Sequence, residues 1–222
     1  EFVIKNKFIF LVFIFFFIKI IIYNYFEIQI NTPNYGYHLL DISLLKNDLF
    51  NSLIYLHSQP PLWNLFNGII AKIMNGEINL ISKFFNIYHC FLTLLIIYFF
   101  IKILREFYLN NKIELFIFFF ITLNPSIIFF ENIFHYTHTT LFFFTLNTYN
   151  IIKLFKTNNY KYEIYIYLNI LILIFIWSLF QPILLLIVFL SIRLLRKNSK
   201  KVFFAFSLIF IISLSPMIKN KI

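Results

Sequence analysis

The residues best suited to chemistry lie in a short polar segment between strongly apolar stretches, residues 57–64, which read HSQPPLWN. His57 can donate a hydrogen bond to phosphate or hold the turn, and a histidine that precedes two prolines more often holds the turn. Gln59 directly precedes a proline, which favours extended backbone and projects its amide away from the helix that follows. We therefore predict that His57 and Gln59 bind substrate at a membrane surface.

Carboxylates that could accept a proton from a substrate hydroxyl lie nearby in the sequence. Asp41 stands beside two leucines at the start of a predicted helix and is the first candidate for a catalytic base, and Asp48 is the second. Aspartate at a helix start also commonly caps the helix, so a structural role for Asp41 stays open. Lys219 could pair with phosphate or simply end a span.

A metal site has weaker support. His135 and His138 have a spacing that one helix face could use together with Glu131, but two histidines and one acid occur often by chance. We predict no metal site at these residues. The expected chemistry leaves room for a divalent ion but requires no other cofactor.

The composition is that of an integral membrane protein. Hydrophobic residues make up 61% of the chain, aromatic residues 23% and charged residues 13%, with a mean hydropathy of +0.83. The net charge of +10 comes from lysines and arginines at the ends of apolar runs rather than on one amphipathic face, which argues against nucleic acid as a partner. The sole cysteine, Cys90, lies in an apolar run and can form no internal disulfide.

The apolar runs predict an all-α fold, a polytopic bundle of transmembrane helices in one domain covering residues 1–222. A hydrocarbon layer about 30 Å thick needs roughly 20 apolar helical residues to cross it. On that basis we predict spans near 8–26, 84–104, 113–130, 137–155, 163–180, 182–196 and 202–217.

Basic clusters then predict the orientation of these spans. The clusters around Lys102, Lys153 and Arg193 should be cytoplasmic, which makes the segment 27–76 an external loop. Within that loop, residues 61–75 are too short to span and have an apolar face, so we predict an interfacial helix that starts at Pro61 and stops near Gly76. Residues 39–55 repeat the amphipathic pattern and predict a second one.

These motifs carry a resemblance to a known family. A first span, then an external loop ending in histidine, Gln59 and Pro-Pro-Leu before an interfacial helix, resembles the C-type glycosyltransferases that use polyprenyl-phosphate sugars, such as protein O-mannosyltransferases and bacterial aminoarabinose transferases. Pro216 to Asn220 is similar to a motif that closes a later span in these enzymes. Asn124-Pro125 followed by residues 131–136 resembles their second external loop, and the resemblance implies that Glu131 binds substrate there by orienting the acceptor or a metal. The chain lacks the Asp-Glu pair that usually follows the first span.

The resemblance implies transfer of a sugar from a polyprenyl-phosphate donor to a hydroxyl of a lipid, glycan or protein acceptor on the non-cytoplasmic face. It further implies a multi-pass protein of the bacterial inner membrane that contacts membrane lipid. Family members are commonly about twice as long, so we expect this chain to be part of a longer protein.

Two other classes stay open. A transporter or lipid flippase would place ionisable residues near the middle of the bilayer, and the predicted spans have almost none there. A noncatalytic assembly subunit would explain the missing Asp-Glu pair, but leaves residues 57–64 without a role.

Overall fold

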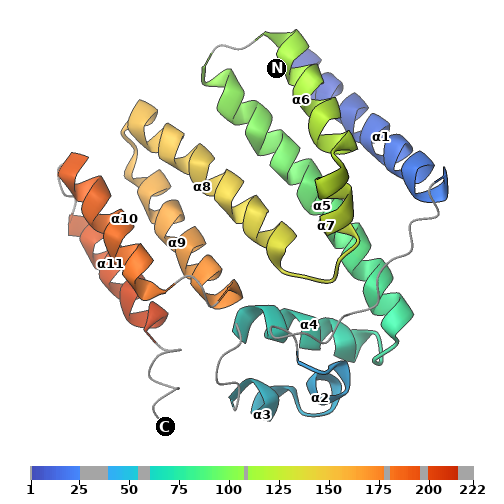
Figure 1. The fold of residues 1–222 in the computed structure, drawn as a ribbon. Coiled ribbons are helices and arrows are strands. Elements are labelled where there is room, and N and C mark those ends of the chain that lie inside the picture. The colour runs from blue at the N-terminus through green and yellow to red at the C-terminus, as the bar shows by residue number, and fades with distance from the viewer. Residues whose placement is uncertain are drawn as a thin grey trace. The chain divides into compact units, whose positions relative to one another are not determined.

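The structure, a computed structural model, describes residues 2–25, 40–54, 61–107, 110–177, 181–195 and 200–214 (Figure 1). All regular secondary structure in these ranges is helical, which confirms the predicted all-α class. Contacts divide the chain into two compact units, Glu1–Pro33 with Ile78–Phe142, and Asn34–Glu77 with Phe143–Ile222. We call them unit 1 and unit 2 and describe each by itself.

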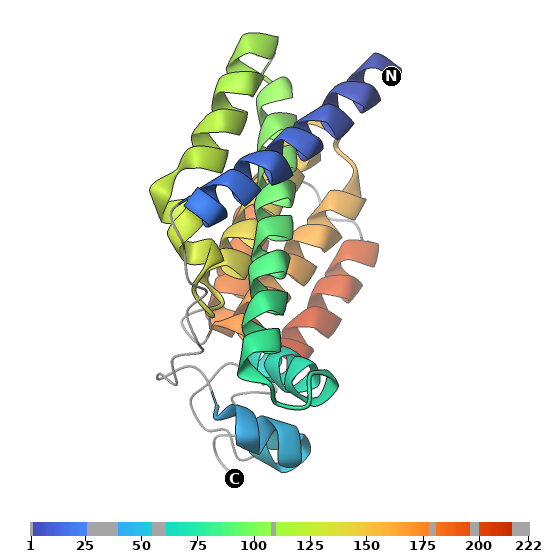
Figure 2. The same ribbon diagram turned by 90° about the vertical axis from the view of Figure 1, so that its right-hand side faces the viewer.

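Unit 1 is built around one long central helix. Its helices are α1 (Phe2–Tyr25), α5 (Ile78–Arg105), α6 (Asn111–Leu123), α7 (Pro125–Glu131) and the first residues of α8 (Thr137–Thr157). Both views show α1 and α6 alongside α5 (Figures 1 and 2). Phe15 and Phe118, from α1 and α6, pack with Ile97 of α5 in the apolar core.

The predicted span at 113–130 is not one straight helix. It is divided into α6 and α7, which are bent by 52° relative to each other. Pro125 lacks the N–H that would continue α6, and the side chain of Asn124 accepts hydrogen bonds from the backbone of Ser126 and Ile127 instead. The bend therefore has a local cause in the sequence, and it sets the direction of α7 and of Glu131 at its end.

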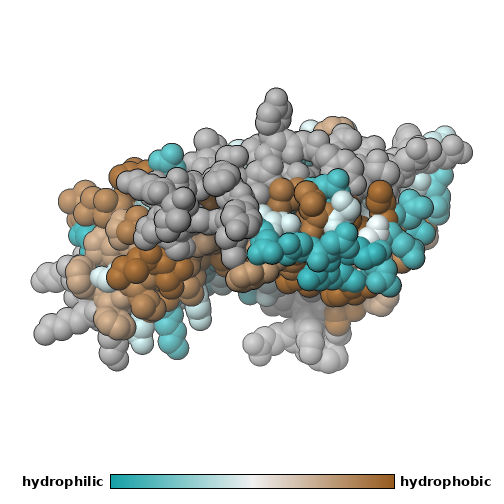
Figure 3. All heavy atoms as spheres, turned by 90° about the horizontal axis from the view of Figure 1, so that it is seen from below, coloured by the Kyte–Doolittle hydropathy of each residue, from teal (hydrophilic) through white to brown (hydrophobic). Residues whose placement is uncertain are grey.

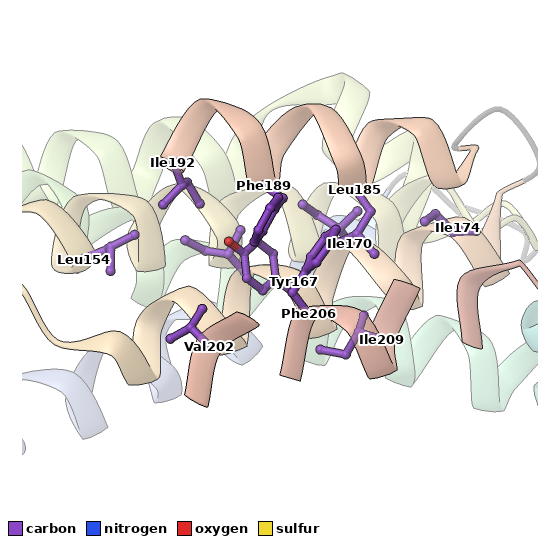
Figure 4. Packing of buried hydrophobic residues seen from close by; sticks show 11 residues of the cluster. Leu154, Tyr167, Ile170, Ile174, Leu185, Phe189, Ile192, Val202, Phe206 and Ile209 are labelled. Carbon is purple, nitrogen blue, oxygen red and sulfur yellow. The ribbon is translucent and has the colours of Figure 1, made fainter. Parts of the chain in front are cut away.

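Unit 2 contains a packed group of C-terminal helices. These are α9 (Tyr160–Ile176), α10 (Pro182–Leu195) and α11 (Lys200–Ser213). Phe189 of α10 and Phe206 of α11 stack with their ring centroids 3.8 Å apart, and Tyr167 of α9 packs edge-on against Phe206 (Figure 4). Leu154 of α8 joins the same core. Aromatic contacts of this kind favour one relative position of the three helices.

Three more helices of unit 2 come from the predicted external loop: α2 (Ile42–Asn47), α3 (Leu49–Ile54) and α4 (Pro61–Ile73). The single amphipathic helix predicted at 39–55 is wrong, because the backbone leaves the helical region at Asp48 and separates α2 from α3. The helix predicted at 61–75 is confirmed as α4. Figure 3, viewed from the α2–α3 side, shows a hydrophilic area of surface with hydrophobic residues directly beside it.

The side chains of α4 face in an unusual direction. Asn64 and Asn67 are buried, whereas Ile69 and Ile73 are 44% and 65% exposed. Asn64 accepts a hydrogen bond from the backbone of Leu40 at 3.0 Å, which accounts for one buried amide. Ile70 and Ala71 are buried as well, so α4 exposes only part of its apolar face.

The end of α4 shows how local sequence fixes a helix terminus. The N–H of Gly76 donates to the carbonyl of Ala71 at 2.8 Å and that of Asn75 to Lys72 at 3.3 Å, the two bonds of a Schellman motif. Asn75 has a φ of 53° and Gly76 a φ of 76°. The predicted stop near Gly76 thus involves two consecutive residues, Asn75 and Gly76, which both have a left-handed backbone conformation.

Gly76→Ala should lower the free energy of unfolding by about 1 kcal/mol, because an L residue is strained at this φ. A Cβ there would also lie 3.1 Å from Cδ of Lys46. Chemical denaturation in detergent measures the change. Asn75→Gly is the matched control and should leave stability unchanged or slightly raised, since glycine adopts positive φ freely. Equal stability of Gly76→Ala and the wild type would contradict this account of the turn.

One helix has the length and composition needed to cross a membrane. Among the described residues, α5 is long and apolar enough to span a bilayer, and the bent α6–α7 pair would be a second if it counts as one span. The other predicted spans coincide with helices, but their crossing of a membrane stays a prediction. Phe10, Phe13 and Phe17 of α1 are 63%, 71% and 65% exposed. In water such an outward apolar surface would be costly, whereas lipid accommodates it.

Candidate functional site

The candidate site is centred on Glu131, the last residue of α7, which is only 1% exposed. Lys19 Nζ lies 2.6 Å from Oε2, and the Tyr23 hydroxyl donates to the same oxygen at 3.0 Å. The Thr93 hydroxyl donates to Oε1 at 2.5 Å. A buried carboxylate is costly unless it is paired and hydrogen-bonded, and here both oxygens are satisfied.

The helices of unit 1 bring these groups together. Lys19 and Tyr23 lie one turn apart on α1, so they share a face. The bend at Pro125 directs α7 along α5, with which it packs. Just beyond Glu131, Phe134 packs edge-on against Phe85 of α5, with ring centroids 4.3 Å apart, and holds the chain against that helix.

Two buried histidines flank the carboxylate, and their hydrogen bonds assign their tautomers. His89 Nδ1 lies 3.3 Å from the carbonyl oxygen of Glu131, which accepts only, so Nδ1 carries the proton. His138 Nε2 lies 2.8 Å from the Thr93 hydroxyl. Because that hydroxyl donates to Glu131, it accepts from His138 Nε2–H. His89 Nε2 and His138 Nδ1 therefore carry lone pairs, and neither has a hydrogen-bond partner among the described residues.

A pocket opens beside this cluster. It is a narrow hollow lined by Ser82, Phe85, Asn86 and His89 of α5 together with residues 131–134, and it leaves essentially no free volume for a water molecule. Asn86 Nδ2 donates to Asn132 Oδ1 at 3.0 Å and so links its two walls. Ser82 Oγ is buried and has no hydrogen-bond partner among the described residues.

The residues predicted from sequence do not all meet at this site. Glu131 is at its centre, in unit 1, whereas Asp41 and Asp48 belong to unit 2. His57, Gln59 and Lys219 lie outside the described residues. Glu131 and His138 are both about 1% exposed and so lie inside the protein.

Asp41 and Asp48 serve helix ends. The Asp41 side chain accepts a hydrogen bond from the backbone N–H of Ser43 at 2.7 Å, which is the capping role left open above. Asp48 terminates α2 and accepts a hydrogen bond from Asn51 Nδ2 at 2.9 Å. Both aspartates are exposed. Their proposed part in catalysis stays a prediction.

Sequence reasoning missed several members of the cluster. Ser82, Asn86, His89 and Thr93 recur at helical spacing along α5 and form a polar stripe on an otherwise apolar helix. This periodicity could have identified the site. Lys19 lies within the predicted span 8–26, and the sequence does not predict its burial, which leaves it only 3% exposed.

The prediction that the spans have almost no ionisable residues near their middle is therefore wrong. His89 lies in the middle of α5, and Lys19 pairs with Glu131 inside unit 1. Two arginines of the basic clusters at predicted span ends also have carboxylate partners. Arg105 binds Glu114 through Nε and Nη2 at 2.6 and 2.9 Å, and Arg193 pairs with Glu163. Among the described residues no group of three histidine, cysteine, aspartate or glutamate side chains is arranged to bind a metal ion.

Comparisons with known proteins identify no relative. No family model, no curated protein and no solved structure matches this chain.

Proposed function

We propose that this protein is a membrane glycosyltransferase that moves a sugar from a polyprenyl-phosphate donor to an acceptor hydroxyl on the non-cytoplasmic face. The observation that carries the proposal is the buried polar cluster around Glu131. Its central residue, Glu131, belongs to the segment that resembles the second external loop of C-type glycosyltransferases, and α1 of the same unit exposes large apolar side chains. Ionisable groups enclosed by apolar helices are costly and are usually retained for function.

The apolar surface bears on where the reaction takes place. A prenyl-linked donor resides in the bilayer, and an enzyme that uses it must present its site at the lipid boundary. α5 is able to cross a membrane, and α4 directs Ile69 and Ile73 outward as an interfacial helix would. The proposal places the protein in the bacterial inner membrane as a multi-pass protein, with its acceptor site on the periplasmic side.

The chemistry of the transfer is a single displacement. The acceptor oxygen forms a bond to the anomeric carbon, while the bond from that carbon to the phosphate oxygen breaks and its electron pair leaves with the lipid phosphate. A base must take the hydroxyl proton, and positive charge or hydrogen-bond donors must stabilise the departing phosphate. Lys19 is the cation of the described cluster, held against Glu131.

Transfer assays on the purified full-length protein in lipid nanodiscs test the proposal. Radiolabelled polyprenyl-phosphate mannose, glucose and aminoarabinose are supplied as donors with a methyl glycoside or lipid A as acceptor. Label should move to the acceptor with at least one donor. Glu131→Gln should reduce the transfer, because it removes the charge that holds Lys19. If none of the donors gives labelled product, the proposed activity is wrong.

A transporter is the second candidate, favoured by the same burial of Lys19, His89 and Glu131 among helices. Ionisable side chains in such positions commonly line substrate or proton pathways. The two hypotheses separate in proteoliposomes. A transporter would carry a fluorescent polyprenyl-phosphate lipid from one leaflet to the other without forming a glycoside, whereas the transferase forms the glycoside whether or not the donor changes leaflet.

A further inference from the structure

One end of the C-terminal helix group of unit 2 carries exposed lysines. Figure 4 shows Leu154, Ile192 and Val202 toward one end of the core that α8, α9, α10 and α11 share. Close to Leu154, the last turn of α8 contains Lys156, and Lys161 lies at the start of α9. Both lysines are exposed. The connection between α8 and α9 therefore presents positive charge at this end of the core.

The acidic residue nearest in sequence does not cancel that charge. Glu163 of α9 is buried, pairs with Arg193 of α10 and accepts a hydrogen bond from the Tyr167 hydroxyl at 2.7 Å. Residues 143–213 contain no other aspartate or glutamate. Glu163 and Arg193 thus neutralise each other inside the protein, and the lysines supply the exposed charge.

The opposite end of the same helices carries no charge. Residues 170–187, which include the end of α9 at Ile176 and the start of α10 at Pro182, contain no lysine, arginine, aspartate or glutamate. The core residue Ile174 lies toward that end in Figure 4. The positive charge is therefore concentrated at one end of these helices and is not a general feature of their surface.

Exposed aromatic side chains flank the lysines. Phe155 directly precedes Lys156 and is 51% exposed, and Tyr160 and Tyr165 of α9 are 40% and 49% exposed. Aromatic rings beside lysines are typical of the boundary between hydrocarbon and lipid headgroups, where the rings lie at headgroup depth and the ammonium groups reach the phosphates. A free phosphate ion would make no use of the exposed rings, so this combination favours a lipid as the source of the anion.

We propose that the α8–α9 connection binds the headgroups of anionic phospholipids, with Lys156 and Lys161 donating hydrogen bonds to the headgroup phosphate. Phosphatidylglycerol, whose headgroup has a net negative charge, fits this surface better than phosphatidylcholine, whose quaternary amine balances the charge of its phosphate. Each lysine close to an anionic membrane surface strengthens the attraction about fivefold. The inference goes beyond the proposed sugar transfer and does not depend on it.

Quenching by brominated lipid tests the proposal at this position in the full-length protein. Phe155→Cys is labelled with bimane and placed in nanodiscs of phosphatidylcholine and phosphatidylglycerol, in which one or the other lipid carries bromine. The buried Cys90 should not react with the dye. Brominated phosphatidylglycerol should quench the label with at least about fivefold higher apparent affinity than brominated phosphatidylcholine. This preference should fall as salt is raised from about 0.1 M to about 1 M, because the Debye length shrinks from about 10 Å to about 3 Å.

Two double variants identify the groups responsible. Lys156→Gln/Lys161→Gln should bring the two apparent affinities within about twofold of each other, since glutamine is polar but carries no charge. Lys72→Gln/Lys83→Gln removes two exposed lysines from α4 and α5 and is the matched control, which should leave the preference unchanged. A bimane label at Ile183→Cys, an exposed position at the uncharged end of the helices, should show no preference between the lipids.

Each other result would overturn the proposal. Equal quenching by the two lipids at Phe155→Cys would show that the connection does not select anionic lipid, and a preference that survives Lys156→Gln/Lys161→Gln would show that these lysines do not bind it. The same preference at Ile183→Cys would reveal a general attraction of the protein for anionic lipid instead of binding at the α8–α9 connection. An excess of soluble glycerophosphoglycerol should not relieve the quenching, and relief would mean that the surface binds a free phosphodiester rather than a lipid.

Discussion

Lys19→Met should lower the free energy of unfolding of unit 1 by about 3–5 kcal/mol, because it leaves the carboxylate of Glu131 buried without its cation. The two groups are 2.6 Å apart, with 3% and 0% of their side chains exposed. Hydrogen bonds from Tyr23 and Thr93 remain, but they do not neutralise the charge. Chemical denaturation in mixed micelles, followed by circular dichroism, measures the loss.

The double variant Lys19→Met/Glu131→Gln distinguishes an unpaired charge from lost packing. With both charges removed, most of the lost stability should return, since a neutral pair of similar size carries a much smaller desolvation penalty. Lys83→Met, an exposed lysine of α5, is the control and should change stability by less than about 0.5 kcal/mol. If Lys19→Met is as stable as the wild type, the buried ion pair at the centre of the candidate site does not form.

Arg193→Met should have an effect of similar size in unit 2, again about 3–5 kcal/mol. Arg193 pairs with Glu163, and the two side chains are 10% and 3% exposed. The Tyr167 hydroxyl donates to the same carboxylate at 2.7 Å. The guanidinium also lies over the ring of Phe189, 4.8 Å from its centroid. Methionine keeps much of the apolar contact with Phe189, so the loss reports the charge rather than the packing.

Two companion variants make the measurement specific. Tyr167→Phe removes a single hydrogen bond to Glu163 and should cost about 1 kcal/mol. Arg193→Met/Glu163→Gln should recover most of the loss of the single variant. If Tyr167→Phe destabilises unit 2 as much as Arg193→Met, the hydrogen bond rather than the ion pair dominates at this site.

Much of the local structure follows from the sequence. Helices occur at each predicted span wherever the structure describes it, because the apolar runs and the helix-starting prolines are local signals. Pro61, Pro125 and Pro182 each begin a helix, at the position where the missing N–H costs nothing. The break between α6 and α7 could have been predicted from Asn124-Pro125, since a proline there cannot continue a helix. The break at Asp48 has no comparably strong signal.

The candidate site was predicted less completely. Glu131 was singled out through its place in a resemblance, while Asp41 was favoured because an acid at a helix start can be held in position. A helix cap and a catalytic base can both be an aspartate at the start of a helix, so the sequence alone does not distinguish the two roles. The helical spacing of the polar residues of α5 shows that their side chains share one face, so this part of the site could have been predicted from the sequence.

The all-helical class and the starts of α4 and α10 can be predicted from the sequence alone, because each depends on neighbouring residues. That Lys19 of α1, Thr93 of α5 and Glu131 of α7 meet is seen only in the folded structure. Helical periodicity indicates which face of a helix is polar, but it does not indicate which other helix supplies the counter-ion or hydrogen-bond partner. That choice follows from packing between segments far apart in the chain, where a buried charge is stable only against its counter-ion.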